Sequence, residues 1–260
     1  MAQLLAAADV RLESRGRRAD LVLAAPERRN AQTPLTWRAL AAAAGWLAGR
    51  ADVVVVRAEG PTFSAGLDRR AFTPEGIPGE FNVGELAALR DPDLDARIRQ
   101  YQEGFAALAD GPFLTIAAVQ GHAVGGGFQL ALACDLRLAT ADAQFCMREP
   151  AFGLVPDLAG THPLVAAVGY ARAVEICATA RWVGADEALA LGLVQGVVPV
   201  DRLEAATDDL VAAVAANVPA AVLATRDLLR GAARRAPAEQ RAAERAAQLP
   251  RLRALAAGHR

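Results

Sequence analysis

Two continuous apolar runs, each followed by a glycine-bearing loop, constrain the fold of this chain more than any other feature. The run "VVVV" at 53–56 leads into "PTFSAGLD" at 61–68, and the run "TIAAV" at 115–119 leads into "GHAVGGG" at 121–127. A strand without polar alternation is typical of a sheet that is covered on both faces. Because helical patterns alternate with such strands along the chain, the sequence predicts an α/β fold.

The rest of the chain continues this alternation and ends in helices. Further strands are expected at 19–26, at 134–140 and around 144–147, with a short one before Pro199. Helices are predicted where apolar residues recur at helical spacing, namely over 33–49, 95–111, most of 160–180, the start of 184–199, and from 203 to the end. Residues 69–95 mix proline, glycine and charge, and we expect a mobile excursion with one short helix there.

The composition of the 260 residues excludes several classes of function. The chain has no lysine, so it has neither a Schiff-base lysine nor a P-loop lysine. A formal net charge of −1 gives no electrostatic footprint for nucleic acid. The three cysteines are widely spaced, which predicts neither a metal site nor a disulfide. No apolar run is long enough to span a bilayer, and the first residues lack the order of a signal peptide, so we expect a cytoplasmic protein.

The two glycine loops have the features of ligand-binding turns. Ligands of α/β sheets bind at the loops beyond the carboxyl ends of the strands. Glycine lets the backbone approach a ligand closely, and the first N–H groups of a helix have no partner inside the helix. Two such loops side by side would offer one N–H each to a single oxygen, which is an oxyanion hole. The alternative for either loop alone is that its glycines only permit a tight turn and close packing.

Two other kinds of active site are excluded by missing motifs. The chain has no G-x-G-x-x-G segment and no Walker lysine, so a nucleotide site is not indicated. It also has no G-x-S-x-G elbow of a serine hydrolase. Ser64 lies in the first glycine loop without an evident base nearby, so we expect a structural role for it.

Five segments, in their order and spacing, carry a resemblance to a known family. They are "PERRNA", "PTFSAGLD", "AAVQGHAVGGGFQLALACDLRLAT", "FGLVPDLAGT" and "GADEALALGLVQGVVP". Together, over about 10–200, they resemble the enoyl-CoA hydratase/isomerase family, the crotonase superfamily. The resemblance implies a ClpP/crotonase-like spiral of β-β-α repeats with a C-terminal helical region. We therefore expect an acyl-CoA-binding core over 1–200 and a helical oligomerisation region over 201–260, in a homotrimer or homohexamer.

The resemblance also implies the positions of the binding groups. The backbone N–H groups of Leu67 and Gly126 would polarise the carbonyl of an acyl-CoA thioester. Ala65, Gly66 and Asp68 would line the CoA side of the site. The thioester oxygen is then expected to fill the space that the glycines leave empty. No cofactor is implied beyond the CoA thioester, which is the substrate.

The acids and bases around this hole decide the reaction. Hydratases of the family use two glutamates, and this chain has Gln129 at the first position and Glu149 at the second. A glutamine amide holds a water but transfers no proton at neutral pH. Asp157 follows Glu149 by eight residues, where dienoyl-CoA isomerases of the family have an aspartate. A cap for the following helix is the alternative for Asp157, and a surface loop acid is the alternative for Glu149.

These residues leave several functions open. The first is an enoyl- or dienoyl-CoA isomerase in which Glu149, with Asp157, moves a proton between carbons. The second is a hydratase whose water is held by Gln129 and Glu149. Thioester hydrolysis, C–C cleavage and acyl-CoA binding without catalysis are further alternatives. For the isomerase we expect Glu149 and Asp157 on one mostly apolar wall, with the pKa of Glu149 raised by burial and Gln129 across from both.

Overall fold

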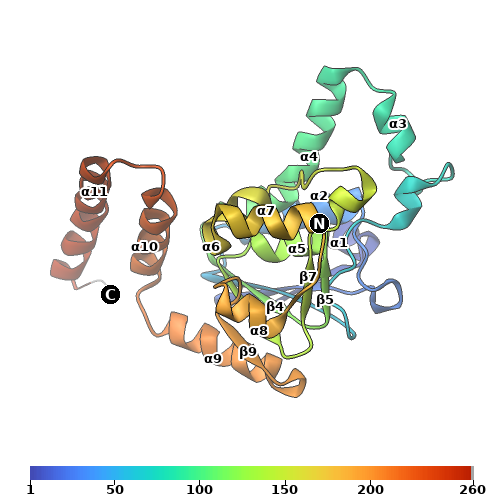
Figure 1. The fold of residues 1–260 in the computed structure, drawn as a ribbon. Helices are drawn as coiled ribbons and strands as arrows, with labels where there is room; N and C mark the ends of the chain where they lie inside the picture. Colours follow the sequence, from blue (N-terminus) through green and yellow to red (C-terminus); the bar gives the residue numbers. More distant parts are fainter. Residues whose placement is uncertain (259–260) are drawn as a thin grey trace.

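The computed structural model describes residues 1–258, which form two sheets surrounded by helices (Figure 1). The larger sheet has six strands in the order β1-β2-β3-β4-β6-β9. Its strands are β1 (Val10–Arg15), β2 (Arg18–Leu23), β3 (Val53–Ala58), β4 (Leu114–Val119), β6 (Leu136–Thr140) and β9 (Gly196–Val198). β1 and β2 are antiparallel, whereas every other neighbouring pair is parallel. The carboxyl ends of β3 and β4 therefore meet at the same edge.

The smaller sheet stands beside this edge and has three strands in the order β5-β7-β8. They are β5 (His122–Val124), β7 (Gln144–Cys146) and β8 (Val183–Gly184). β5 follows β4 after two residues, and β7 follows β6 after three. A strand of the large sheet, a short strand of the small sheet and a helix thus repeat along the chain, which is the β-β-α pattern that the resemblance implied.

The helices are distributed around both sheets and into the C-terminal part (Figure 1). They are α1 (Ala2–Ala7), α2 (Pro34–Leu47), α3 (Val83–Ala87), α4 (Asp91–Ala109), α5 (Gly126–Leu132), α6 (Thr161–Val168), α7 (Tyr170–Thr179), α8 (Ala185–Ala190), α9 (Leu203–Ala215), α10 (Pro219–Ala232) and α11 (Pro237–Ala256). Single 3-10 turns are η1 (Pro26–Arg28), η2 (Arg69–Phe72), η3 (Glu149–Phe152) and η4 (Val200–Arg202). α2 begins at Pro34 because Thr33 and Thr36 form a reciprocal cap of its first turn.

Both faces of the large sheet are covered, as the continuous valine run predicts. Val54 and Val56 of β3 belong to the main apolar core, together with Leu40 of α2 and Phe105 of α4. The alternate residues of β3 point the other way and pack in a smaller cluster with Val211 of α9. The sheet is therefore a rigid platform for the loops at its carboxyl edge.

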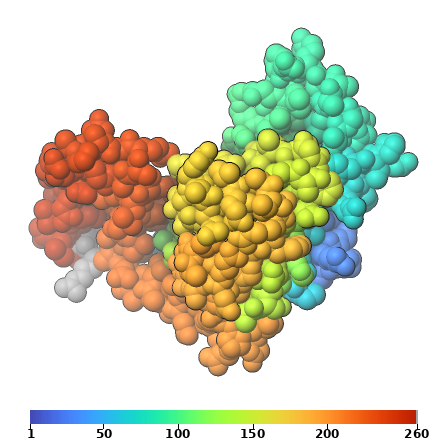
Figure 2. All heavy atoms as spheres, in the orientation of Figure 1, coloured from blue at the N-terminus to red at the C-terminus, as the bar shows by residue number. Residues whose placement is uncertain are grey.

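The C-terminal helices extend away from the body of the molecule (Figures 1 and 2). α10 is held by two arginines: Arg226 donates to the carbonyl of Gly111 over 2.8 Å, and Arg230 donates to Asp135 over 2.6 Å. α11, over its described length, has no buried residue. Within residues 1–258 no single helix is long and apolar enough to cross a membrane. Residues 200–215 and α10 reach the required length and hydrophobicity only when they are taken together, and the chain bends by 100° between them.

The expected elements are found, with five differences. β1, β5 and β8 were not predicted, and the long C-terminal helix is broken into α9, α10 and α11. β5 and β8 have three and two residues, too few to show any periodicity. Pro219 and Pro237 each stand at the first position of a new helix, where proline is favoured, although Pro250 lies inside α11. The helix expected from 95 begins already at Asp91. The boundary between a core and a separate helical region at 200 stays a prediction.

Candidate active site

The two glycine loops lie side by side, held by backbone hydrogen bonds. The N–H of Ser64 donates to the carbonyl of His122 over 2.9 Å, and the N–H of Val124 donates to the carbonyl of Ser64 over 3.0 Å. The loop after β3 therefore pairs with β5 through one parallel bridge, between Ser64 and Ala123. This pairing brings the segments that contain Leu67 and Gly126 next to each other.

The backbone N–H groups of Leu67 and Gly126 both lack a hydrogen-bond acceptor among the described residues. Neither donates a hydrogen bond to any group of residues 1–258. Gly126 is the first residue of α5, so its N–H has no acceptor within the helix. A Cβ placed on Gly66 would lie 3.2 Å from the Gly126 nitrogen, which shows how closely the two loops approach. Both N–H groups are therefore available, on two loops that lie against each other.

The three consecutive glycines are required by the protein's own atoms more than by a ligand. A Cβ on Gly125 would lie 3.2 Å from Oε1 of Glu149, and one on Gly127 would lie 2.5 Å from the carbonyl oxygen of Ser64. Gly125 also has φ +49°, which side chains rarely adopt. The expectation that a ligand oxygen fills the space left by these glycines is therefore wrong for Gly125 and Gly127, whose neighbours are Glu149 and Ser64.

Ser64 is structural. Its hydroxyl donates to the carbonyl of Asn30 over 2.7 Å. The same oxygen accepts from the Gln32 side chain over 3.1 Å and from the Gly66 N–H over 3.2 Å. These three bonds fix the loop ahead of Leu67 and leave no role for the hydroxyl as a nucleophile.

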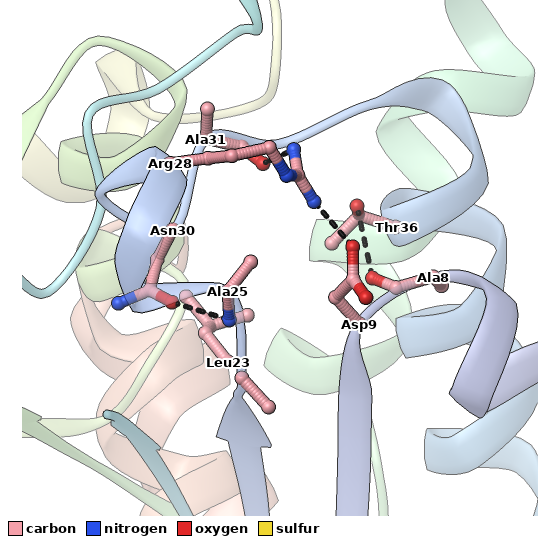
Figure 3. A pocket seen from close by; sticks show the side chains of 9 residues that line it. Ala8, Asp9, Leu23, Ala25, Arg28, Asn30, Ala31 and Thr36 are labelled. Atoms are coloured by element: carbon pink, nitrogen blue, oxygen red, sulfur yellow. Dashed lines mark hydrogen bonds and ion pairs between the residues drawn. The ribbon is translucent and has the colours of Figure 1, made fainter. Parts of the chain in front are cut away.

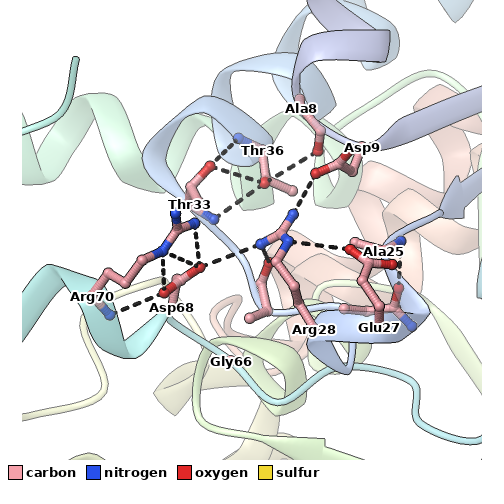
Figure 4. A network of polar contacts seen from close by, with 12 residues as sticks. Ala8, Asp9, Ala25, Glu27, Arg28, Thr33, Thr36, Gly66, Asp68 and Arg70 are labelled. Atoms are coloured by element: carbon pink, nitrogen blue, oxygen red, sulfur yellow. Dashed lines mark hydrogen bonds and ion pairs between the residues drawn. The ribbon is translucent and has the colours of Figure 1, made fainter. Parts of the chain in front are cut away.

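Asp68 belongs to a network of arginines on the outer side of the loop (Figure 4). Its carboxylate accepts from Arg70 over 2.8 Å and from Arg28 over 3.3 Å, and Arg28 also pairs with Asp9. The hydrogen bonds from Arg70 are the main reason why the pKa of Asp68 is lowered. Asp68 also accepts from the N–H of Arg70 and so caps η2. The Asp68 carboxylate is thus already paired, and Arg28 and Arg70 are the charged groups beside it.

Ala65 and Gly66 are tied into the same loop through their backbones. The N–H of Ala65 donates to the carbonyl of Arg29 over 2.9 Å, and the carbonyl of Gly66 accepts from Gln32 over 2.7 Å. The cavity on the other side of Arg28 has a volume of about 10 Å³, which is room for about one water molecule. Figure 3 shows that Asp9, Asn30 and Thr36 surround it. This cavity is too small for a substrate.

Glu149 faces the second glycine loop from the start of η3. Its Oε1 accepts a hydrogen bond of 2.7 Å from Nε2 of Gln129. Its Oε2 is buried and has no hydrogen-bond partner among the described residues. Burial raises the pKa of this carboxyl, and the charge of Asp157 raises it further. Glu149 is thus not a surface loop acid.

Gln129 occupies a different place from the one expected. It is completely buried in α5, and its Oε1 accepts from the N–H groups of Leu158 and Gly160 over 2.9 and 3.1 Å. The expectation that Gln129 lies across the pocket from both acids is wrong, because it is bonded directly to Glu149. Its position follows from α5, where the glycines let the helix approach closely enough for this contact.

Asp157 lies in the loop between η3 and α6. Burial raises its pKa as well. The N-cap of α6 is Gly160, with no side-chain hydrogen bond, so the alternative that Asp157 caps this helix is wrong. The loop is held by Gln102 of α4, whose Nε2 donates to the carbonyl of Asp157 over 2.7 Å. Two carboxyls with raised pKa values therefore belong to the same part of the site.

Sequence reasoning missed two aromatic residues beside these groups. Phe72 of η2 and Phe152 of η3 stack with ring centroids 5.7 Å apart, and both are partly exposed. They connect the element that follows Leu67 with the element that carries Glu149. A cavity of about 530 Å³ lies next to Phe72, between η2 and α3. Single phenylalanines in polar segments show no periodicity, so the sequence held no signal for this pair.

Other candidate groups lie outside the site. The exposed ring of His122 packs edge-on against Trp182, with ring centroids 5.3 Å apart. Over residues 1–258, no group of three His, Cys, Asp or Glu side chains could hold a metal ion.

The chain resembles known proteins over most of its length. A family profile described as Enoyl-CoA hydratase/isomerase matches residues 19–250. A relative from Mycobacterium tuberculosis, named probable enoyl-CoA hydratase EchA17, is 35% identical over 225 residues, which are 83% of this chain and 78% of the relative.

Solved structures from Thermobifida fusca YX, of a protein described as an enoyl-CoA hydratase, are also similar. The complex with CoA has a TM-score of 0.92 and 46% identity, and the match covers 98% of this chain and 97% of that one. The complex with acetoacetyl-CoA has a TM-score of 0.92 and 47% identity, with 97% and 98% covered. The predicted fold class, α/β of the crotonase type with C-terminal helices, is confirmed.

The burial of Glu149 leads to a prediction about stability. The folded state raises its pKa above the unfolded value, so folding disfavours the ionised form; this cost grows as pH rises through the unfolded pKa and is complete above the folded pKa. Glu149→Gln is therefore expected to stabilise the protein at about pH 7 by on the order of 1 kcal/mol, and by much less at about pH 4. Urea unfolding at both pH values measures this, and a variant less stable than the parent at neutral pH would contradict it.

Proposed function

This chain belongs to the enoyl-CoA hydratase/isomerase family, and we propose that it is an isomerase that shifts a carbon–carbon double bond of an acyl-CoA thioester. The observation that carries the proposal is Glu149: a buried carboxyl with one unpartnered oxygen, packed against the glycine loop that offers the Gly126 N–H. The CoA and acetoacetyl-CoA complexes of the Thermobifida fusca protein support a CoA thioester as the ligand.

The two free N–H groups supply the electrostatic part of the reaction. Leu67 and Gly126 donate to the thioester oxygen, on which negative charge develops when a proton leaves C2. The donors are fixed by the backbone pairing around Ser64, so they need no rearrangement during the reaction. One such donor is typically worth about 10²–10³ in rate.

Glu149 supplies the proton transfer. Its carboxylate takes a proton from C2, the electrons of the C–H bond form the enolate, and the double bond moves. The same carboxyl then returns the proton two carbons away, so no atom is gained or lost. A group that must take and give a proton works best with a pKa near the working pH, which is the direction in which burial moves the pKa of Glu149. Asp157 extends the shuttle to a more distant carbon in a dienoyl substrate.

Hydration is the second candidate, because the Mycobacterium relative and the Thermobifida structures carry the hydratase name. Hydration needs a second group that transfers a proton to or from water, and Gln129 cannot do so. Its oxygen is also already occupied by two peptide N–H groups. These contacts support isomerisation over hydration.

The acyl group is proposed to extend past Phe72 and Phe152. Both rings are partly exposed and flank the loops that carry Leu67 and Glu149. The neighbouring cavity of about 530 Å³ provides room for an apolar chain. An enoyl substrate with an aliphatic chain fits this wall better than a charged acyl group.

The reaction is tested with a panel of 2-enoyl-, 3-enoyl- and dienoyl-CoA substrates in H₂¹⁸O. Isomerisation converts a 3-enoyl or dienoyl substrate without taking up ¹⁸O, whereas hydration of 2-enoyl-CoA gives a labelled 3-hydroxy product. Glu149→Gln is expected to lower kcat by about 10²–10⁴-fold, the range for one general acid–base group. Near-parental turnover in this variant would overturn the mechanism. If the protein binds CoA thioesters but turns over none of these substrates, the result would indicate an acyl-CoA-binding protein without this activity.

The oxyanion hole is tested at Gly66. A Cβ there would collide with the carbonyl oxygen of Val124 and crowd the Gly126 nitrogen, so Gly66→Ala is expected to lose about 10²-fold or more in kcat. Gly16→Ala is the matched control, because Gly16 also has positive φ but open space around it. Both variants lose some stability in thermal unfolding, and only Gly66→Ala loses activity. Equal activity in the two variants would contradict the hole.

We also propose that the protein assembles as a homotrimer or homohexamer through its C-terminal helices. α11 exposes Leu249, Leu252 and Leu255, three leucines that recur every three residues along the helix. Such a stripe on a helix with no buried residue over its described length needs a partner surface. Light scattering at micromolar concentration is expected to give three or six subunits, and Leu252→Glu to give smaller species. A parental monomer would contradict this assembly.

A further inference from the structure

The hydrogen-bond partners of the Gln129 side-chain amide determine which of its ends is the oxygen and which is the nitrogen. Two peptide N–H groups, those of Leu158 and Gly160, point at one end of the amide over 2.9 and 3.1 Å. Because these groups only donate, the end that faces them is the carbonyl oxygen, and the NH₂ end must face Glu149. The resulting donor–acceptor distance to Glu149 Oε1 is 2.7 Å, at the short end for a hydrogen bond to a charged acceptor.

We infer that Gln129 is a positioning residue, which pins Oε1 of Glu149 and leaves Oε2 as the oxygen that exchanges the proton with the substrate. This inference rests on the proposed function. It adds a separate role for each oxygen of the Glu149 carboxylate, and a role for the Gln129 amide, which transfers no proton itself. Oε2 is the buried oxygen that has no partner among the described residues.

The amide also joins two parts of the site that are otherwise independent. Glu149 belongs to η3, whereas Leu158 and Gly160 belong to the loop that carries Asp157. Gln129 of α5 lies between them and is completely buried. The same amide therefore bonds the Glu149 carboxylate and the backbone of the loop that carries Asp157.

Besides the backbone at Glu149 and Arg148, which also lowers the pKa of the Glu149 carboxyl, Gln129 is the one side-chain donor to it among the described residues. The ionisable groups near it are Asp157, Cys146 of β7 and Cys177 of α7, and both cysteines are themselves affected by its charge. No arginine side chain within residues 1–258 pairs with the Glu149 carboxylate, and Gln129 is the one side chain there that donates to it. Removing this donor disfavours the ionised form, so the pKa of Glu149 rises further.

The test compares substitutions of two glutamines, one in α5 and one in α4, that each hydrogen-bond the backbone of the loop carrying Asp157. Gln129→Met keeps approximate size and loses all three hydrogen bonds. Gln102→Met, the matched control, loses only the bond to the carbonyl of Asp157. Gln129→Met is expected to move the acid limb of the kcat–pH profile upward by about one unit and to lower kcat about tenfold or more, with KM changed much less. Gln102→Met is expected to leave the acid limb in place. An unmoved limb in Gln129→Met, or an equal shift in both variants, would overturn the inference.

Gln129→Glu keeps the test decisive if Gln129→Met does not fold. A glutamate still accepts from Leu158 and Gly160 but places a second carboxyl against Glu149, and two carboxyls that share a site hold a proton between them. The acid limb is again expected to move upward by at least about one unit. An unchanged limb in a folded Gln129→Glu protein would overturn the inference.

A measurement without turnover separates this inference from the proposed function. Infrared difference titration follows the carboxyl C=O band of Glu149, assigned by its loss in Glu149→Gln. An upward shift of this titration in Gln129→Met supports the positioning role even if no enoyl-CoA is turned over, in which case only the proposed function fails. Turnover by the parent with no shift of the band in Gln129→Met leaves the proposed function standing and overturns the inference.

Discussion

The site depends on the backbone pairing between the loop after β3 and the short strand β5. Two hydrogen bonds of Ser64, to His122 and from Val124, pair the loop with β5 through a single parallel bridge. Without these bonds, the N–H groups of Leu67 and Gly126 would lie on two separate loops whose relative position is less constrained. The large sheet contributes the common edge, since β3 and β4 are parallel neighbours whose carboxyl ends meet there. The small sheet then sets the position of each donor along that edge.

The glycines follow from this close approach. Gly66, Gly125 and Gly127 each face atoms of the opposite segment at distances that leave no room for a side chain. The glycine loop is therefore compact because three protein segments converge on it: the loop after β3, η3 and α5. Gly126 differs from its neighbours, since the nearest atoms to its Cβ would be the ends of the Gln32 and Leu158 side chains, at 3.2 and 3.3 Å. It carries the free N–H of a turn whose other glycines serve packing.

The sequence could predict the parts of the fold that carry long periodic signals. The valine run of β3, the buried run of β4 and the loops after them were recognisable because a continuous apolar strand and a glycine-rich turn are distinctive over several residues. β5 and β8 could not be predicted, since strands of three and two residues are created by tertiary pairing. The acids Glu149 and Asp157 were identifiable through the family resemblance. The bond between Gln129 and Glu149 was not, because it depends on a helix approach that only the folded glycine turn permits.

Two acids of this chain, Asp68 and Glu149, have opposite environments. Asp68 is nearly buried but surrounded by Arg28 and Arg70, so its pKa is lowered and it remains an ionised structural anchor. Glu149 is buried beside an amide and a second carboxyl, so its pKa is raised. The arginine-rich sequence pairs its cations with other acids and places none of them against Glu149 within the described residues. A guanidinium at that position would hold Glu149 permanently ionised and remove its ability to return a proton. A neutral glutamine orients the carboxyl without that effect, so an amide suits the proposed reaction better than a cation would, because in that reaction one carboxyl takes and gives the same proton.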